Sequence, residues 1–257
     1  MPTTVETTKV LEESAVPAGH VGAPPLYGRM MKAIASSHEW GNRVRMLKLP
    51  LIFAEERLYA GAIAQFYWLT ATLEDALARH DGHPMVSRVK ALGLTLTPGY
   101  AADLAQILGA GWRDEVARMK TAATASYCDI LNAAGPVELV AASFILYGAL
   151  VVGGGKVTQQ KVKKVFPKCD HVLFDVADDM KSARQKFKNT YTAIGKEWPE
   201  HFETLEAQAA RYMQLNNAVV LSVQCWGRRA STYTAYAAAG LAAAVTLVAA
   251  VRWARSG

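Results

Sequence analysis

The spacing of apolar residues constrains the fold most, because they recur at helical intervals through nearly the whole of residues 28–228. This spacing places apolar side chains along one face of each helix. Alternating runs of β-branched residues bounded by turns, which are typical of strands, are almost absent from this stretch. Since 51% of the 257 residues are hydrophobic, the chain can bury a sizeable core. The sequence therefore predicts an all-α bundle.

Proline and glycine divide this stretch into separate helices. Pro50 precedes the second helix, and Gly82 and Pro84 end it. We expect helices over residues 27–41, 54–80, 97–108, 112–134, 137–165, 175–196 and 199–227.

Three consecutive glycines, Gly153, Gly154 and Gly155, interrupt the helix expected over 137–165. Each costs about 1 kcal/mol relative to alanine inside a helix, so their presence needs a reason. They form either a loop or kink packed against a neighbour, or a backbone that a flat ligand can approach closely.

The two ends of the chain differ from the middle. Residues 1–26 are rich in Thr, Pro and Gly and lack apolar periodicity, so we expect an extended arm, either a free tail or a strap that docks on a partner. No secretory signal is present, and three glutamates argue against a transit peptide.

Residues 233–251 carry no charge over roughly the 20 positions that a helix needs to cross a bilayer. We expect one transmembrane helix within a C-terminal anchor, 229–257, so that the helical domain spans 27–228. Arginines flank the run, and a face of small residues around Gly240 suits packing against other transmembrane helices. The alternative is a buried alanine-rich helix of a soluble core.

The net charge limits the classes of partner that the chain can bind. The formal net charge of +6 favours anionic surfaces, and membrane lipid is the expected partner. Nucleic acid is not expected, because the lysines of 156–168 lack interleaved stacking aromatics.

The three cysteines, Cys128, Cys169 and Cys225, are odd in number, and no second cysteine or histidine stands near them at zinc-ligand spacing. Neither a disulfide framework nor a structural zinc site is expected.

His38, late in the first helix, would by itself be an ordinary surface or capping histidine. The order of motifs nevertheless resembles the heme oxygenase family over about residues 28–225, plus the tail. After His38 come an apolar helix with aromatic residues and Leu73-Glu74-Asp75, then 147–154 (YGALVVGG), 186–191 (KFKNTY) and the predicted anchor.

The resemblance implies a heme-oxygenase-like helical bundle with heme as its cofactor. His38 would ligate the heme iron, Gly153 and Gly154 would lie over the other face, and a basic side chain such as Lys188 would hold a propionate. The family's activity is oxidative opening of heme to biliverdin, carbon monoxide and ferrous iron, with electrons from a reductase.

Several family positions are not kept in this chain. The aspartate that organises the water network for proton delivery falls on Leu150, which can neither accept nor relay a proton. The carboxylate one turn after the histidine falls on Asn42. The family's first distal glycine, a distal arginine, a distal tyrosine and an arginine for a propionate fall on Ala149, Leu146, Thr70 and Thr192.

These losses favour a membrane-anchored protein of degenerate activity that serves as an accessory or structural subunit of a membrane complex, with heme binding left open. The alternative is an active heme oxygenase. The weak, basic-flanked anchor favours the mitochondrial membrane first and the endoplasmic reticulum second.

Overall fold

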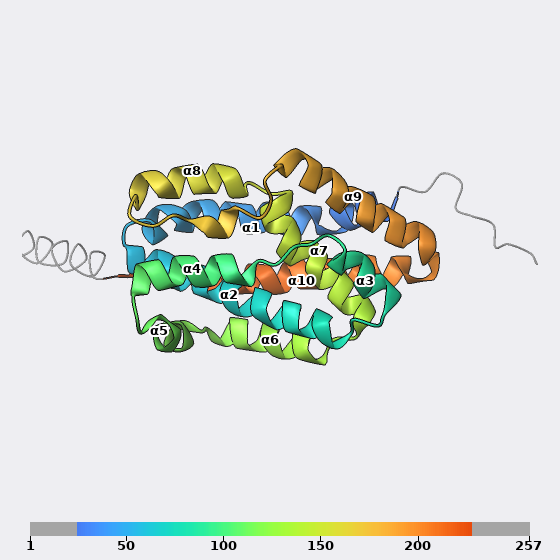
Figure 1. Ribbon diagram of the computed structural model, residues 1–257, viewed down its shortest axis with the longest axis horizontal. Helices are drawn as coiled ribbons and strands as arrows, with labels where there is room; N and C mark the ends of the chain where they lie inside the picture. The colour runs from blue at the N-terminus through green and yellow to red at the C-terminus, as the bar shows by residue number, and fades with distance from the viewer. Residues whose placement is uncertain (1–24, 228–257) are drawn as a thin grey trace, which may run out of the picture.

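The computed structural model describes residues 25–227, and every regular element in that range is helical (Figure 1). The prediction of an all-α fold is confirmed. The elements are α1 (Leu26–Ile52), α2 (Glu56–Arg79), α3 (Pro84–Lys90), α4 (Thr97–Leu108), α5 (Trp112–Met119), α6 (Ala122–Ala133), α7 (Pro136–Val151), α8 (Gly155–Val165), the 3-10 turn η1 (Val172–Phe174), α9 (Met180–Glu197), the 3-10 turn η2 (Pro199–His201) and α10 (Phe202–Ser222). The expected N-terminal arm (apart from its last two residues) and the C-terminal anchor lie outside the described residues.

Helix α7 forms the centre of the core. It is apolar around its whole circumference, so it is stable only when surrounded, and residues 139–147 are all buried against α2, α3, α9 and α10. Phe144 of α7 meets Phe187 and Tyr191 of α9 with ring centroids 5.8 and 5.0 Å apart. These contacts fix the position of α9 relative to α7.

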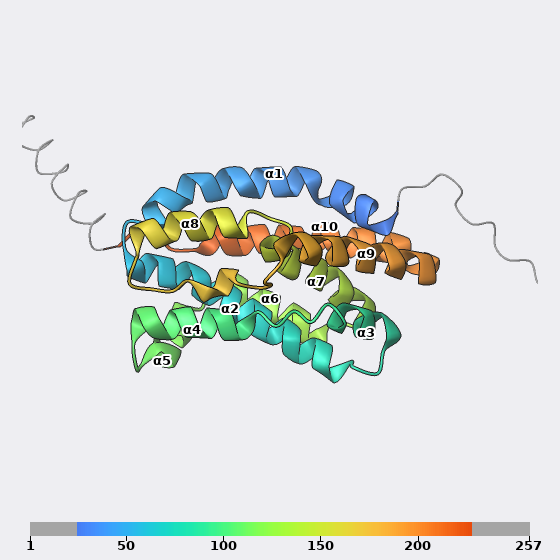
Figure 2. The same cartoon turned by 45° about the horizontal axis from the view of Figure 1, so that its top comes forward.

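Helix α1 runs along one side of the bundle and packs mainly on α10 (Figure 2). The predicted end at Gly41 is wrong, because α1 continues through Pro50 to Ile52. Gly41 is helical and buried against Asn217 of α10. Further on, the Lys48 ammonium donates to the carbonyl oxygens of Val220 and Val223 at 2.9 and 2.8 Å, which holds the second half of α1 on the end of α10.

The interruption predicted at the glycines is confirmed. α7 ends at Val151, α8 begins at Gly155, and the two helix axes differ by 53°. The backbone N–H groups of Val152 and Gly153 both donate to the carbonyl of Gly148, which closes α7. Within the described residues no single helix meets the length and hydropathy that a bilayer crossing requires, whereas α7 and α8 meet them together as a bent pair.

The other predicted bounds need correction. The helix expected over 112–134 is two helices, since Lys120 and Thr121 are extended and Thr121 caps α6 by accepting from the N–H of Thr124 at 3.2 Å. The buried Gln65 amide holds this break, because its oxygen accepts from the Thr121 N–H at 3.0 Å. α3 was not expected. α9 begins later than predicted, after its cap residue Asp179, and α10 begins later because η2 precedes it.

Candidate functional site

The inward stripe of α1 is uncovered in its middle. Ile34 and Ile52 are buried, and His38 and Arg45 lie on nearly the same helical face at spacings of i+4 and i+11 from Ile34. Both His38 and Arg45 are nevertheless exposed. The imidazole of His38 is therefore accessible on the surface of α1.

The imidazole of His38 has no hydrogen-bond partner among residues 25–227. Asn42, one turn later, uses its amide oxygen to accept from the Arg45 guanidinium at 2.5 Å. The imidazole thus lacks the orienting partner that a carboxylate at position 42 would provide. A neutral imidazole offers a nitrogen lone pair, which is the donor that iron requires.

The glycines at the α7–α8 break have different surroundings. A Cβ on Gly153 would collide with the carbonyl oxygen of Ala149 in the preceding turn, so this glycine is required by the backbone itself. A Cβ on Gly154 would have no atom within 4 Å, apart from its own neighbours in the chain. Gly154 is exposed, so a side chain at this position would meet no neighbouring atom of the described chain.

The side chains of α7 just before this break are apolar. Leu146 and Leu150 are only 4% and 8% exposed. The neighbouring hydroxyls are engaged, since Ser143 donates to Val140 and pairs with Tyr191 at 2.8 Å. Thr70 of α2 donates to the carbonyl of Phe66 at 2.9 Å. No carboxylate stands at position 149 or 150.

Lys188 lies on α9 with its side chain exposed. Arg184, one turn before it, donates from Nε to the carbonyl of Val151 at 3.0 Å and so ties this face of α9 to the end of α7. Sequence reasoning missed Arg184, although its i+4 spacing from Lys188 on a basic helix face was a usable signal.

The residues present fit a flat iron porphyrin. The chain offers an exposed imidazole on α1, an exposed glycine at position 154, apolar side chains at positions 146 and 150 of α7, and an exposed ammonium on α9 that suits a carboxylate. A cleft of about 1690 Å³ is elsewhere, between the end of α1 and Phe166, and none of the predicted site residues lines it. It also has no histidine in its lining.

Comparison with known proteins identifies the family. A family model described as heme oxygenase matches residues 26–220. Heme oxygenase 1 of Synechocystis sp. is 26% identical over 188 residues, 70% of this chain and 76% of that protein. Heme oxygenase 1 of Nostoc sp. is 28% identical over 102 residues, and the match spans 42% of its length.

Solved structures show the same fold. The crystal structure of heme oxygenase 2 from Chlamydomonas reinhardtii without heme has a TM-score of 0.73 at 26% identity, covering 79% of this chain and 100% of that one. Heme oxygenase-1 from Synechocystis in complex with heme has a TM-score of 0.66 at 22% identity, covering 87% of this chain and 100% of that one, which bears on the fold alone. The chain belongs to the heme oxygenase family.

Proposed function

We propose that this chain is a heme-binding member of the family in which heme cleavage is reduced or lost, held in a membrane by residues 233–251 as an accessory subunit of a larger complex. His38 serves as the axial ligand, and Lys188 faces a propionate. Heme, when bound, would supply the iron at which the family carries out oxygen chemistry. Membership of the heme oxygenase family, over residues 26–220, supports heme as the ligand class.

The single observation that carries reduced activity is Leu150, a buried side chain at the family's aspartate position. Leucine has no donor or acceptor, so it holds no water in place for proton delivery. General acid–base steps contribute roughly 10²–10⁴-fold in rate, which is the scale of loss we expect. The engaged hydroxyls of Ser143 and Thr70 offer no substitute.

Two observations support the membrane proposal. Residues 233–251 are uncharged and flanked by arginines. Large apolar side chains are also exposed along the α1–α10 edge, namely Trp40, Leu47, Leu51 and Leu221. We place the protein in the mitochondrial membrane first, because basic flanks suit cardiolipin, and in the endoplasmic reticulum second.

The experiment is a hemin titration of the full chain, followed by absorption. We expect a Soret band that His38→Ala abolishes and that His201→Ala, on the distant η2, leaves unchanged. Gly154→Leu should weaken hemin binding at least tenfold. Helicity should be kept, because no neighbouring atom lies within 4 Å of the position that its Cβ would take. A Soret band retained in His38→Ala would refute this ligand assignment.

Addition of a competent reductase and oxygen to the hemin complex then tests the activity. We expect no bilin absorption band over many times the turnover period of an active family member assayed in parallel. Rapid release of bilin would overturn the proposal and establish the active heme oxygenase as the function.

A further inference from the structure

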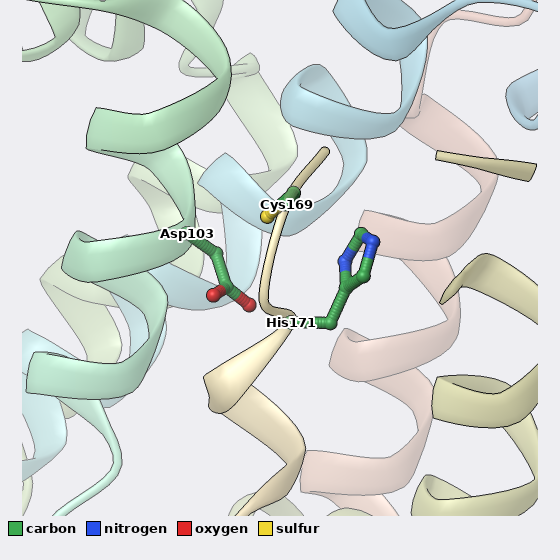
Figure 3. Close-up of side chains that lie close together, drawn as sticks. All are labelled: Asp103, Cys169 and His171. Atoms are coloured by element: carbon green, nitrogen blue, oxygen red, sulfur yellow. The ribbon is translucent and has the colours of Figure 1, made fainter. Parts of the chain in front are cut away.

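A compact group of three polar side chains is buried in a part of the fold that does not include His38. Asp103 of α4 and Cys169 and His171 of the connector before η1 are 0%, 4% and 0% exposed. One ligand-type atom from each lies within 4.8 Å of the others (Figure 3). Buried polar groups of this kind occur together only when something satisfies them.

His171 is held in a defined orientation. Its Nε2 lies 2.9 Å from the carbonyl oxygen of Phe166, and because a carbonyl only accepts, Nε2 carries the proton. Nδ1 therefore keeps a lone pair, to which the hydroxyl of Tyr59 approaches at 3.3 Å. Metal-binding histidines commonly donate their second N–H to a backbone carbonyl in this way. The backbone at His171 is left-handed, with φ 54°, a conformation that costs energy for a non-glycine residue.

The other two side chains are oriented as well. The Asp103 carboxylate accepts from the backbone N–H groups of Val172 at 2.8 Å and Leu173 at 3.1 Å, which fixes it at the start of η1. A carboxylate oxygen that accepts one such bond retains a second lone pair. Burial raises the pKa of the Cys169 thiol to about 11, and the backbone N–H of His171 opposes this shift only in part, so the thiol is protonated until a metal displaces its proton.

We propose that Cys169 Sγ, His171 Nδ1 and a carboxylate oxygen of Asp103 bind one Zn²⁺, with the Tyr59 hydroxyl beside the fourth position. A thiolate, an imidazole and a carboxylate together select zinc over magnesium or calcium. Tetrahedral zinc separates its ligand atoms by roughly 3.5 Å, so the three groups draw in by about an ångström. Binding releases the thiol proton of Cys169 to solvent.

The site would be structural. It joins α4 to residues 166–179, the segment that links α8 to α9. The sequence expectation against zinc considered only cysteine and histidine spacings, and it passed over Cys169 and His171 because their third partner, Asp103, comes from a separate helix. The proposal does not depend on heme binding.

The test uses the full chain, purified without heme, stripped with a chelator and loaded with Co²⁺, whose thiolate charge-transfer and visible bands report the ligands. We expect one Co²⁺ per chain, a thiolate band, tetrahedral visible bands and displacement by Zn²⁺. Cys169→Ser should lose the thiolate band. Cys128→Ser is the matched control, since Cys128 is equally buried, at 3% exposed, but lies outside the cluster.

His171→Asn is a second variant, and we expect it to fold because asparagine tolerates the left-handed backbone at this position. We expect its Zn²⁺ affinity to fall at least tenfold, with helicity by circular dichroism unchanged. Absence of saturable one-to-one binding, or a thiolate band that survives Cys169→Ser, would overturn the proposal. Loss of the band in Cys128→Ser would do the same.

Discussion

Single residues show how closely α1 and α10 approach. Asn217 packs its side chain against Gly41 and donates from Nδ2 to the carbonyl of Ser37 at 2.7 Å. A Cβ on Gly41 would overlap the Asn217 amide. Gly61 of α2 differs, because the nearest atom to its Cβ position is the sulfur of Met119 at 4.0 Å. Two helical glycines in one bundle therefore have opposite roles.

We expect Gly41→Ala to destabilise the protein by about 1–3 kcal/mol, because Asn217 must move and leave the Ser37 carbonyl without its partner. Gly61→Ala should instead stabilise it by up to about 1 kcal/mol, since alanine lowers the entropy lost on helix formation. Urea unfolding of both variants measures the two signs. Equal effects would show that the Gly41–Asn217 contact is not specific.

At the scale of elements, α9 depends on its first turn. Asp179 caps the helix by accepting from the N–H groups of Lys181 at 2.8 Å and Ser182 at 3.2 Å, and from the Ser182 hydroxyl. The Ser182 hydroxyl first, and then the two backbone N–H groups, lower the pKa of Asp179. Helix α9 carries Arg184 and Lys188, so this cap supports the candidate site.

Because the pKa of Asp179 is lower in the folded state than in the unfolded state, its charge stabilises the fold above the unfolded value of about 3.9, and this contribution is lost as pH falls through the folded pKa. We expect Asp179→Ala to lower the Tm at pH 7, with the difference from wild type shrinking in acid. Asp179→Asn, which keeps an accepting oxygen, should lower the Tm less. A Tm difference that is constant from neutral pH into acid would contradict this role of the charge.

At the scale of the whole molecule, the exposed large apolar side chains of α1 and α10 include Trp40, Leu47, Leu51 and Leu221. Trp40 and Leu221 line one groove between α1 and α10, and Leu47 and Leu51 continue the Trp40 stripe at i+7 and i+11. Leu47 is 77% exposed. Helix α1, which carries three of these four side chains, lies on the opposite side of the bundle from α4 (Figure 2). A bilayer-facing edge is the arrangement we expect from the anchor proposal.

A fluorophore sensitive to polarity, such as NBD, tests this on the full chain. Attached to Leu47→Cys, it should shift to the blue when vesicles of phosphatidylcholine and cardiolipin are added. Attached to Ala102→Cys on the exposed face of α4, it should not shift. The native cysteines are at most 6% exposed, so labelling is confined to the introduced site. Equal responses at the two positions would contradict the proposed orientation.

Local rules determined much of this protein from the sequence alone. Apolar periodicity predicted the all-α class and the helix at 97–108, in which Pro98 suits the first turn, and the glycines marked the break after α7. The order of motifs identified the family. Each of these signals comes from residues that are close together in the chain, so it can be recognised in the sequence alone.

Only the tertiary structure decided the rest. Lys48 holds α1 on the end of α10 far along the chain, and Gln65 sets the break before α6 through a partner that the local sequence does not contain. The exposure of His38 depends on how α1 is covered by other helices. Asp103 meets His171 only because α4 packs on η1. Hydrogen bonds between distant segments leave no periodic trace in a sequence, which is why the geometry of both sites had to come from the fold.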